Sequence, residues 1–326
     1  MQQSEPLFPA FTDRASYEAM RPDVNVWLRA MRVICQRHGL PIEGLVRFGD
    51  GTDLAFGTTI VFAIGEHYVI KLYPPYLTQL FEAERTVAKY VYGKLSVSTP
   101  EIYAQDSLEG WPYLVMSRLQ GVYLSDIWDT LEDTNQLRIV IELAEVVAQL
   151  HALPTHDLSL LEANWSAWVA DQVKRCVQHH QEQGVPEYWL QQIPGYLECA
   201  APLYPLDFPP SIVSGDIHQY HLLARQEHGQ WRLCGMFDFD DGRIGFSEYD
   251  LAAAGLFLMA GRPELLRTFL LTYGYAESAI DEHLSHRLMA YTLLHPYRPF
   301  NWVREAFTKR PCPTLKELAE VIYAFE

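Results

Sequence analysis

The segment SGDIHQYHLL, residues 214–223, places one carboxylate and two imidazoles within six residues of each other. Asp216 is followed by His218 and His221, and the acidic segment FDFDD, which contains Asp238, begins at residue 237. One carboxylate can accept the proton of an attacking hydroxyl group, and a second can hold a divalent cation. Zinc binding by the two histidines is the competing interpretation. It requires further cysteine or histidine ligands, and no motif supplies them.

A lysine and a glutamate form a second group with chemical potential. Lys71 lies in the β-branched run VIKLY, and Glu84 lies in the helical pattern FEAERTVAKYV. A strand lysine paired with a glutamate of the following helix is how kinase-like folds position the phosphates of a nucleotide. Glu82 is the competing partner. We favour Glu84 because Val87 and Val91 follow on its own helical face.

The pattern of the chain predicts the elements that must carry these residues. Before Gly121, we expect strands over 45–48, 58–64, 67–73 and 111–121 and a helix over 81–95. The Gly65-Glu66 dipeptide predicts a hairpin turn. After Gly121, the pattern is mainly helical, with a long amphipathic helix that Thr134 is expected to cap and one embedded hairpin that turns at His228-Gly229.

This order of elements predicts an α+β protein of two lobes. We expect an N-lobe over residues 1–120, with a helical extension, an antiparallel sheet and one helix. We expect a larger, mainly helical C-lobe over residues 121–326. A cleft between two lobes commonly holds a ligand.

Five segments, taken in order, resemble the aminoglycoside phosphotransferase and choline kinase-like family. They are Lys71, Glu84, YLVMSRLQG, SGDIHQYHLL and FDFDDGRIGFSEYDLA, and the match runs from about Leu45 to Leu251. The family pattern is H-G-D-x-H-x-x-N, then a strand, then I-D-F or I-D-W, then D-L-A. The resemblance implies the bilobal protein-kinase-like fold, with a small β-rich N-lobe and a larger helical C-lobe.

The resemblance also implies a role for each matching polar residue. Asp216 would be the catalytic base, and Asp238 would be the main Mg²⁺ ligand. Lys71, oriented by Glu84, would hold the phosphates of ATP. Asp250 would be structural and would tie the loop after Asp238 to the helical core.

The adenine and phosphate contacts follow from the same resemblance. Met116 would stand at the back of the adenine pocket, and the backbones of Ser117 and Leu119 would bond to the adenine edge. Three glycines would shape the loop over the phosphates, namely Gly49, Gly51 and Gly57. They do not form a strict G-x-G-x-x-G motif.

Two positions depart from the family pattern. Ser214 stands where the family has a histidine of mostly architectural role. His221 stands where the family has an asparagine that is the second metal ligand, and an imidazole suits transition metals better than Mg²⁺. The candidate metal ligands are Asp238 and His221. Either His221 contacts phosphate or water rather than metal, or the site holds one metal through Asp238 alone.

The composition limits the partners. The 326 residues carry a formal net charge of -16, which argues against nucleic acid and anionic membranes. No apolar run approaches the roughly 18 residues of a membrane span, and the first residues lack the pattern of a secretory signal. The five cysteines show no CxxC spacing, which argues against a disulfide framework. We expect a cytoplasmic protein that is a monomer or a weak homodimer.

Taken together, the sequence predicts an ATP- and Mg²⁺-dependent phosphotransferase that acts on a hydroxyl group of a small molecule. Acidic residues favour an aminated acceptor, whereas aromatic residues favour a flatter alcohol. The candidate acceptor contacts are Asp240, Asp241, Glu248, Trp165, Trp168, Trp189, His295, Tyr297 and Trp302. A nucleotide-binding pseudokinase or regulatory protein is the alternative that His221 keeps open. A protein kinase is disfavoured because residues 158–203 contain no recognisable activation segment.

Overall fold

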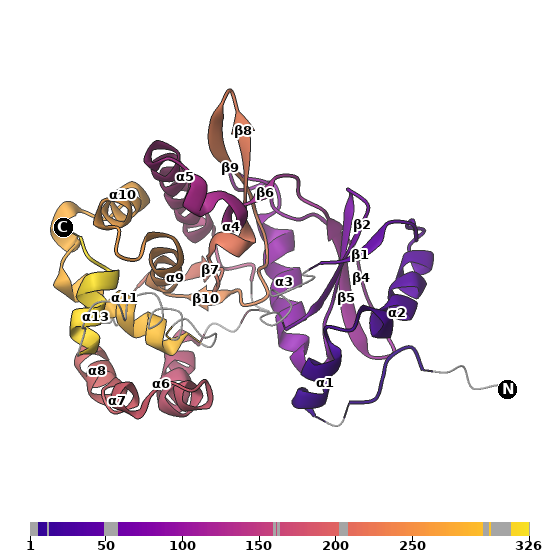
Figure 1. The fold of residues 1–326 in the computed structure, drawn as a ribbon, viewed down its shortest axis with the longest axis horizontal. Helices are drawn as coiled ribbons and strands as arrows, with labels where there is room; N and C mark the ends of the chain where they lie inside the picture. Colours follow the sequence, from indigo (N-terminus) through magenta and orange to yellow (C-terminus); the bar gives the residue numbers. More distant parts are fainter. Residues whose placement is uncertain are drawn as a thin grey trace. The chain divides into compact units, whose positions relative to one another are not determined.

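The computed structural model describes residues 6–11, 13–48, 58–158, 161, 164–201, 208–295, 300 and 314–325. The chain divides into two compact units (Figure 1). The first unit comprises Met1–Lys94 and Ser98–Gln120, and the second comprises Leu95–Val97 and Gly121–Glu326. The predicted α+β class is confirmed, since the first unit is built around an antiparallel sheet and the second is mainly helical.

The first unit contains a five-stranded sheet in the order β1-β2-β3-β5-β4, with every neighbouring pair antiparallel. The hairpin expected at Gly65-Glu66 joins β2 to β3. The elements of the unit are α1 (Arg14–Met20), α2 (Val24–Arg37), β1 (Leu45–Arg47), β2 (Ile60–Ile64), β3 (Tyr68–Leu72), the 3-10 turn η2 (Pro75–Leu77), α3 (Thr78–Val91), β4 (Ile102–Leu108) and β5 (Trp111–Ser117).

Strand alternation divides the core of this unit between the two faces of the sheet. On β5, Trp111, Tyr113 and Val115 join the buried cluster that includes the α2 residues Trp27 and Met31. The residues between them, Leu114 and Met116, join a second cluster with Leu80 and Phe81 of α3. Successive side chains of a strand point to opposite faces, so the two helices cover opposite sides of one sheet.

The edge strand β4 was not predicted. It lies at the end of the sheet, beside β5 only, and most of its residues are exposed or half-buried. Only its last residue, Leu108, is buried, and such a strand lacks the apolar alternation by which strands are recognised. The boundaries also differ, because α3 begins at Thr78 rather than at Phe81 and β5 ends at Ser117.

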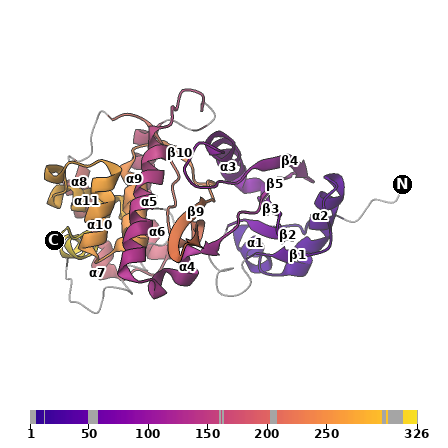
Figure 2. The same ribbon diagram turned by 90° about the horizontal axis from the view of Figure 1, so that it is seen from above.

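The second unit is mainly helical. Helix α5 packs against α10 and strand β9, and α9 packs against α10 and α11, as Figure 2 also shows. The helical elements are α4 (Leu124–Ile127), η3 (Trp128–Thr130), α5 (Asp133–Ala152), α6 (Trp165–Glu182), α7 (Glu187–Leu190), α8 (Ile193–Ala200), η5 (Gln219–His221), α9 (Glu248–Met259), α10 (Pro263–Tyr273), η6 (Glu277–Ala279), α11 (Glu282–Leu294) and α13 (Leu315–Ile322). The expected cap at Thr134 is wrong, since α5 begins one residue earlier and its N-cap residue is Glu132.

Two small sheets lie within this unit and frame the chemistry-bearing loops. Strand β6 (Val122–Tyr123) pairs with β8 (Leu222–Glu227), which pairs with β9 (Gln230–Met236). The predicted hairpin turn at His228-Gly229 is confirmed. Strand β7 (Ser211–Val213) pairs with β10 (Arg243–Gly245). The segment 214–221 therefore connects the two sheets, and the segment 237–242 returns from one to the other.

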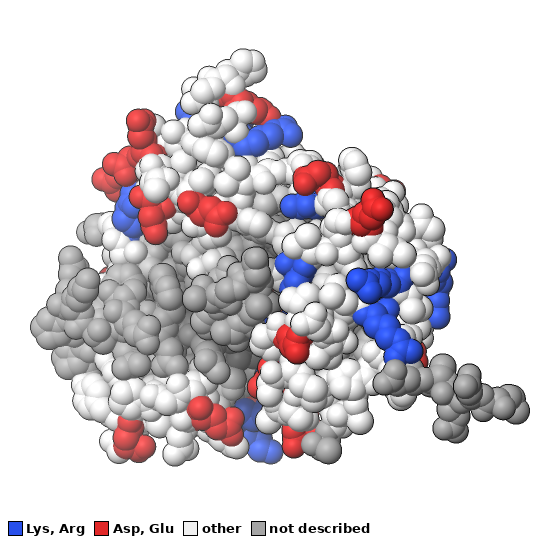
Figure 3. Space-filling view, turned by 45° about the vertical axis from the view of Figure 1, so that its right-hand side comes forward, with Lys and Arg blue, Asp and Glu red and all other residues white. Residues whose placement is uncertain are grey.

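Acidic and basic side chains both occur over the described surface drawn in Figure 3. Within the described part of the chain, no helix has both the length and the apolar character that crossing a bilayer would require. Cys35, Cys176, Cys199 and Cys234 are free thiols.

Candidate active site

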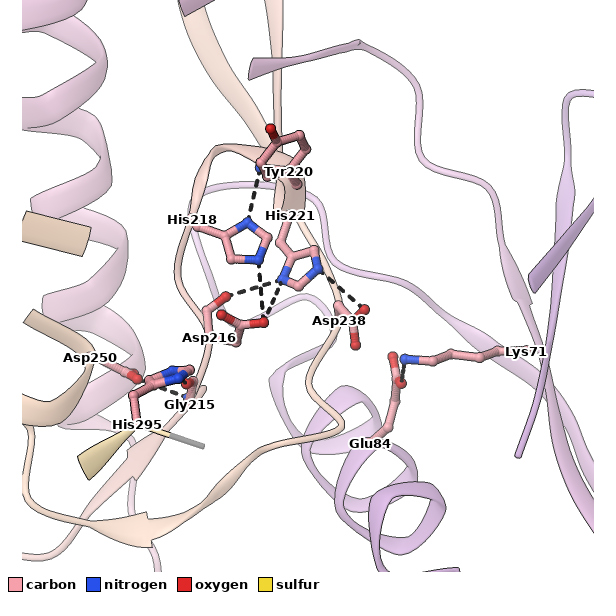
Figure 4. A network of polar contacts seen from close by, with 10 residues as sticks. All are labelled: Lys71, Glu84, Gly215, Asp216, His218, Tyr220, His221, Asp238, Asp250 and His295. Atoms are coloured by element: carbon pink, nitrogen blue, oxygen red, sulfur yellow. Dashed lines mark hydrogen bonds and ion pairs between the residues drawn. The ribbon is translucent and has the colours of Figure 1, made fainter. Parts of the chain in front are cut away.

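The first unit carries one candidate functional group, an ion pair between Lys71 and Glu84. On β3, Ile70 and Leu72 point into the α2 side of the core, so Lys71 between them points to the α3 side. There, Lys71 Nζ donates to Glu84 Oε2 at 2.5 Å (Figure 4). The two side chains are only 5% and 2% exposed, so this pair is held in surroundings with little water.

A residue that the sequence reasoning missed completes this ion pair. The hydroxyl of Tyr73 donates to Glu84 Oε2 at 2.7 Å, and Lys71 Nζ lies 5.5 Å from the centre of the Tyr73 ring. Tyr73 is two residues after Lys71, so strand alternation could have placed it on the same face. The competing partner Glu82 instead binds Arg85, one turn along the same helix.

The predicted adenine contacts lie at the end of β5. Met116 is buried in the cluster on the α3 side of the sheet, and Leu119 is half-buried. The Ser117 amide donates to Glu101 O at 2.8 Å, and Ser117 Oγ accepts from Glu101 N at 2.9 Å. A contact from the Ser117 backbone to adenine would therefore use its carbonyl. Gly49, Gly51 and Gly57 lie outside the described residues.

The second unit carries a separate candidate functional group, the loop that contains Asp216. His218 Nε2 lies 3.3 Å from Asp216 Oδ2, and His221 Nδ1 lies 3.7 Å from the same oxygen. Burial raises the pKa of Asp216, but His218, His221 and His295 together outweigh it and lower the pKa to about 2. Asp216 is consequently ionised throughout the physiological range.

The hydrogen bonds of the two imidazoles assign their tautomers. His218 Nδ1 accepts from the Tyr220 amide at 3.1 Å, so its proton is on Nε2, which faces Asp216. His221 Nδ1 lies 3.1 Å from the carbonyl oxygen of Asp216. A carbonyl can only accept, so His221 carries its proton on Nδ1. Burial, together with His218, lowers the pKa of His221 and favours the neutral ring.

Asp238 lies directly beyond the β8–β9 hairpin and faces the other nitrogen of His221. Leu222 pairs with Met236 in that hairpin, and the Phe237 amide donates to His221 O at 3.2 Å. His221 Nε2 is 3.4 Å from Asp238 Oδ2. Asp238 has φ +67, a left-handed conformation that aspartate adopts more readily than most residues. The hairpin thus brings Asp216 and Asp238 to opposite nitrogens of one imidazole (Figure 4).

Asp250 is structural, but it does not hold the loop that we expected. Its carboxylate accepts from the amides of Ser214 at 2.7 Å and Gly215 at 2.8 Å, and it contacts His151 Nε2 at 3.0 Å. The expectation that it ties the loop after Asp238 to the core is corrected by these contacts. Asp250 fixes the start of the loop before Asp216, because the first turn of α9 presents its carboxylate to two backbone donors.

His295 and Gly215 provide the second restraint on the Asp216 loop. His295 Nε2 donates to Gly215 O at 3.0 Å, and its ring stacks on Tyr249. Through this contact His295 supports the Asp216 loop. Gly215 has φ +87, and a Cβ at this position would lie 2.7 Å from Asp241 O. Only glycine fits both the conformation and the space.

The other expected acceptor contacts have mixed outcomes. Trp165 stacks on Trp168 at 4.8 Å, and the guanidinium of Arg243 lies 4.4 Å from the centre of the Trp168 ring. Glu248 is not free to contact an acceptor, since its buried carboxylate binds Arg287 through two hydrogen bonds and accepts from Tyr275. Asp241 is buried and Asp240 is half-buried, whereas Trp189 packs against Phe300. Tyr297 and Trp302 lie outside the described residues.

The possible metal ligands around Asp216 include both carboxylate oxygens and imidazole nitrogens. Ligand atoms of Asp216, His218 and His221 lie within 4.8 Å of one another, and Asp238 contacts the far side of His221. The Asp238 carboxylate suits Mg²⁺, which prefers oxygen ligands. The His221 nitrogen does not, because imidazole favours later divalent metals.

The comparisons with known proteins concern the family and the fold of the chain. Residues 57–283 match the model of the phosphotransferase enzyme family, APH. A GDP complex of a mutant aminoglycoside 2′-phosphotransferase-IIIa is 17% identical over 90% of this chain and 95% of its own, with a TM-score of 0.67. A GDP and kanamycin complex of APH(2″)-IIIa is 16% identical over 90% and 96%, with a TM-score of 0.65. APH(3″)-Id from Streptomyces rimosus is 17% identical over 82% and 97%, with a TM-score of 0.57.

Proposed function

Because the chain belongs to the phosphotransferase enzyme family, we propose that it transfers the γ-phosphoryl group of ATP to a hydroxyl group of a small molecule. The observation that carries this proposal is the position of Asp216 and Asp238 at the two nitrogens of His221. An ionised carboxylate that can receive a proton and a second carboxylate that can hold a cation are the two groups that phosphoryl transfer requires.

Asp216 serves as the base in this proposal. Its carboxylate is ionised and is oriented by the hydrogen bond from His218. It would accept a hydrogen bond from the acceptor hydroxyl and then take the proton as the new O–P bond forms. A pKa of about 2 makes Asp216 a weak base. That is adequate for a loose transition state, in which positioning contributes more than early proton removal.

Lys71 and Asp238 serve the nucleotide. Lys71 would contact its phosphates, and Glu84 and Tyr73 hold the lysine in one orientation. Asp238 would hold a divalent cation, with His221 beside it. When bound, such a cation would neutralise negative charge that develops during transfer.

For the acceptor, we propose an alcohol of small size and test two chemical classes. Kanamycin, an aminoglycoside, is named with one solved structure that resembles this chain. Asp240 and Asp241 follow Asp238 closely and favour an aminated acceptor. The stacked Trp165 and Trp168 favour a flatter ring.

The test is an acceptor panel with product identification. Purified protein is incubated with ATP or GTP, a divalent cation and single acceptors from both classes, and phosphorylated product is detected by mass spectrometry. We expect acceptor-dependent release of ADP from ATP, or of GDP from GTP, that matches phosphorylated product one to one.

The Asp216→Asn variant is the control for this test. It keeps shape and nucleotide contacts but lacks a proton acceptor, so transfer should fall while nucleotide binding persists. Nucleotide binding without transfer to any acceptor, equal in the wild type and in Asp216→Asn, would instead support the regulatory alternative. Family membership does not favour that alternative.

A further inference from the structure

The imidazole of His221 is oriented as a metal ligand. Its Nδ1 donates to the carbonyl oxygen of Asp216 at 3.1 Å, which leaves the lone pair of the neutral ring on Nε2. Histidine ligands of metals usually donate their other ring N–H to a carbonyl or carboxylate, and this bond fixes the tautomer and the ring orientation. His221 has this arrangement, with Nε2 directed at Asp238 (Figure 4).

The distance between Nε2 and Asp238 Oδ2 suits two ligands of one small cation. Both atoms are acceptors when the ring is neutral, yet they lie only 3.4 Å apart. Metal–nitrogen and metal–oxygen bonds of about 2.1 Å place two ligands roughly 3.4 Å apart at a tetrahedral angle. The side chains of His221 and Asp238 are 19% and 26% exposed, so an ion from solvent can reach them.

His218 lacks the corresponding lone pair. Its Nδ1 accepts the Tyr220 amide, and its Nε2 carries the proton that faces Asp216. Binding a metal through His218 would break one of these two hydrogen bonds. The cluster of Asp216, His218 and His221 is therefore less suited to an ion than the pair of His221 and Asp238, although its ligand atoms are close together.

We propose that His221 Nε2 and Asp238 Oδ2 bind a late first-row dication, of the Co²⁺ to Zn²⁺ class, more tightly than they bind Mg²⁺. Imidazole nitrogen favours these ions, and Mg²⁺ prefers oxygen ligands. The inference deepens the proposed function, because it concerns which cation Asp238 holds.

Co²⁺ is the probe for this site, in buffer that contains no nucleotide and no acceptor. Titration is followed by the absorption bands of the bound ion. Proton NMR then detects the exchangeable ring N–H of the bound histidine, shifted by the paramagnetic ion. We expect one such resonance, from the Nδ1–H of His221, and we expect Mg²⁺ to displace Co²⁺ only at large excess.

The His221→Asn variant replaces nitrogen with an amide oxygen. We expect this variant to lose the shifted resonance and to bind Co²⁺ at least about tenfold more weakly. Removing only a hydrogen-bond partner of a metal ligand already weakens metal binding by about this factor. His228→Asn is the matched control, since this exposed turn residue has φ +52, which asparagine tolerates. It should leave both signals unchanged, as should His218→Asn. Circular dichroism verifies that each variant is folded.

The outcomes separate this inference from the proposed function. A shifted resonance that survives in His221→Asn, or that disappears in His218→Asn, overturns the assignment of the ligand. Equal displacement of Co²⁺ by Mg²⁺ in the wild type and His221→Asn overturns the preference. Because no phosphoryl transfer is measured, an inactive enzyme with the expected cobalt signals would contradict the proposed function alone.

Discussion

Lys71 and Glu84 form an ion pair that is almost completely withdrawn from solvent, with Nζ and Oε2 2.5 Å apart. Removing one member of a buried pair leaves the other charge uncompensated, at a cost of about 3–5 kcal/mol. We therefore expect Glu84→Gln and Lys71→Met each to lower the free energy of unfolding by that order. The double variant should lose less free energy of unfolding than the two single variants lose together. Urea denaturation of all four proteins measures this coupling.

The control for this prediction is Glu82→Gln. Glu82 pairs with Arg85 on the same helix, and its side chain is 45% exposed. Exposed pairs contribute about 0–1 kcal/mol, so this variant should unfold almost as the wild type does. Additive effects of Lys71→Met and Glu84→Gln would show that the two residues do not interact in solution.

We expect Asp250→Asn to destabilise the Asp216 loop. The carboxylate accepts from two backbone amides and contacts His151. The side-chain amide of asparagine would place an NH₂ group, which can only donate, against one of these N–H donors. Loss of a buried, charged hydrogen-bond acceptor costs about 1.5–3 kcal/mol. Thermal and urea unfolding should show this loss, and turnover should fall with it.

The same change at Asp281 is the matched control. Asp281 caps α11 by accepting from the Leu284 amide, and asparagine is about as good as aspartate in an N-cap position. Asp281→Asn should therefore be nearly neutral. Equal stability of both variants would show that Asp250 does not restrain the loop.

Gly215→Ala should lower the free energy of unfolding by more than the strain of a left-handed alanine alone would. A new Cβ would lie 2.7 Å from Asp241 O, so either the Asp216 loop or the segment after Asp238 must move. Gly229→Ala provides the comparison, because Gly229 has φ +79 and nothing lies within 4 Å of its added Cβ. We expect Gly229→Ala to cost about 1–2 kcal/mol and Gly215→Ala to cost more and to reduce turnover. If both variants lost similar amounts of free energy of unfolding in urea, the clash at Gly215 would be contradicted.

Asp216 should give the enzyme a base that does not titrate in the working range. The pKa of Asp216 is lowered from 3.8 to about 2, so its ionised form stabilises the folded state fully above pH 4. That stabilisation is lost as the pH falls through about 2. The difference in the free energy of unfolding between wild type and Asp216→Asn should therefore shrink as the pH falls below about 4.

The same pKa predicts the shape of the activity profile. Asp216→Asn should lower turnover roughly 10²–10⁴-fold, the usual contribution of a general base, with the same pH dependence between pH 5 and 8. An acid limb that is present in the wild type and absent from Asp216→Asn would show that Asp216 titrates in that range. In that event, His221 becomes the residue to test as the base.

Residues that share a strand, a helix face or a hairpin could be placed from sequence. Strand alternation puts Lys71 and Tyr73 on one side of β3, and helical spacing favoured Glu84 over Glu82. The β8–β9 hairpin, which the pattern predicted, places the segments of Asp216 and Asp238 next to each other. These relationships depend on the periodicity of strands and helices and on turn residues, and short stretches of sequence are enough to predict both.

The restraints on the Asp216 loop were decided only by tertiary structure. Asp250 reaches the Gly215 amide across 35 residues, and His295 reaches the Gly215 carbonyl across 80. Both contacts depend on how α9 and α11 pack, and no local pattern specifies that packing. The tautomer of His221 also follows from a single carbonyl contact. Residue types alone could therefore name the candidate ligands, but the side chain contacts determine which nitrogen faces Asp238.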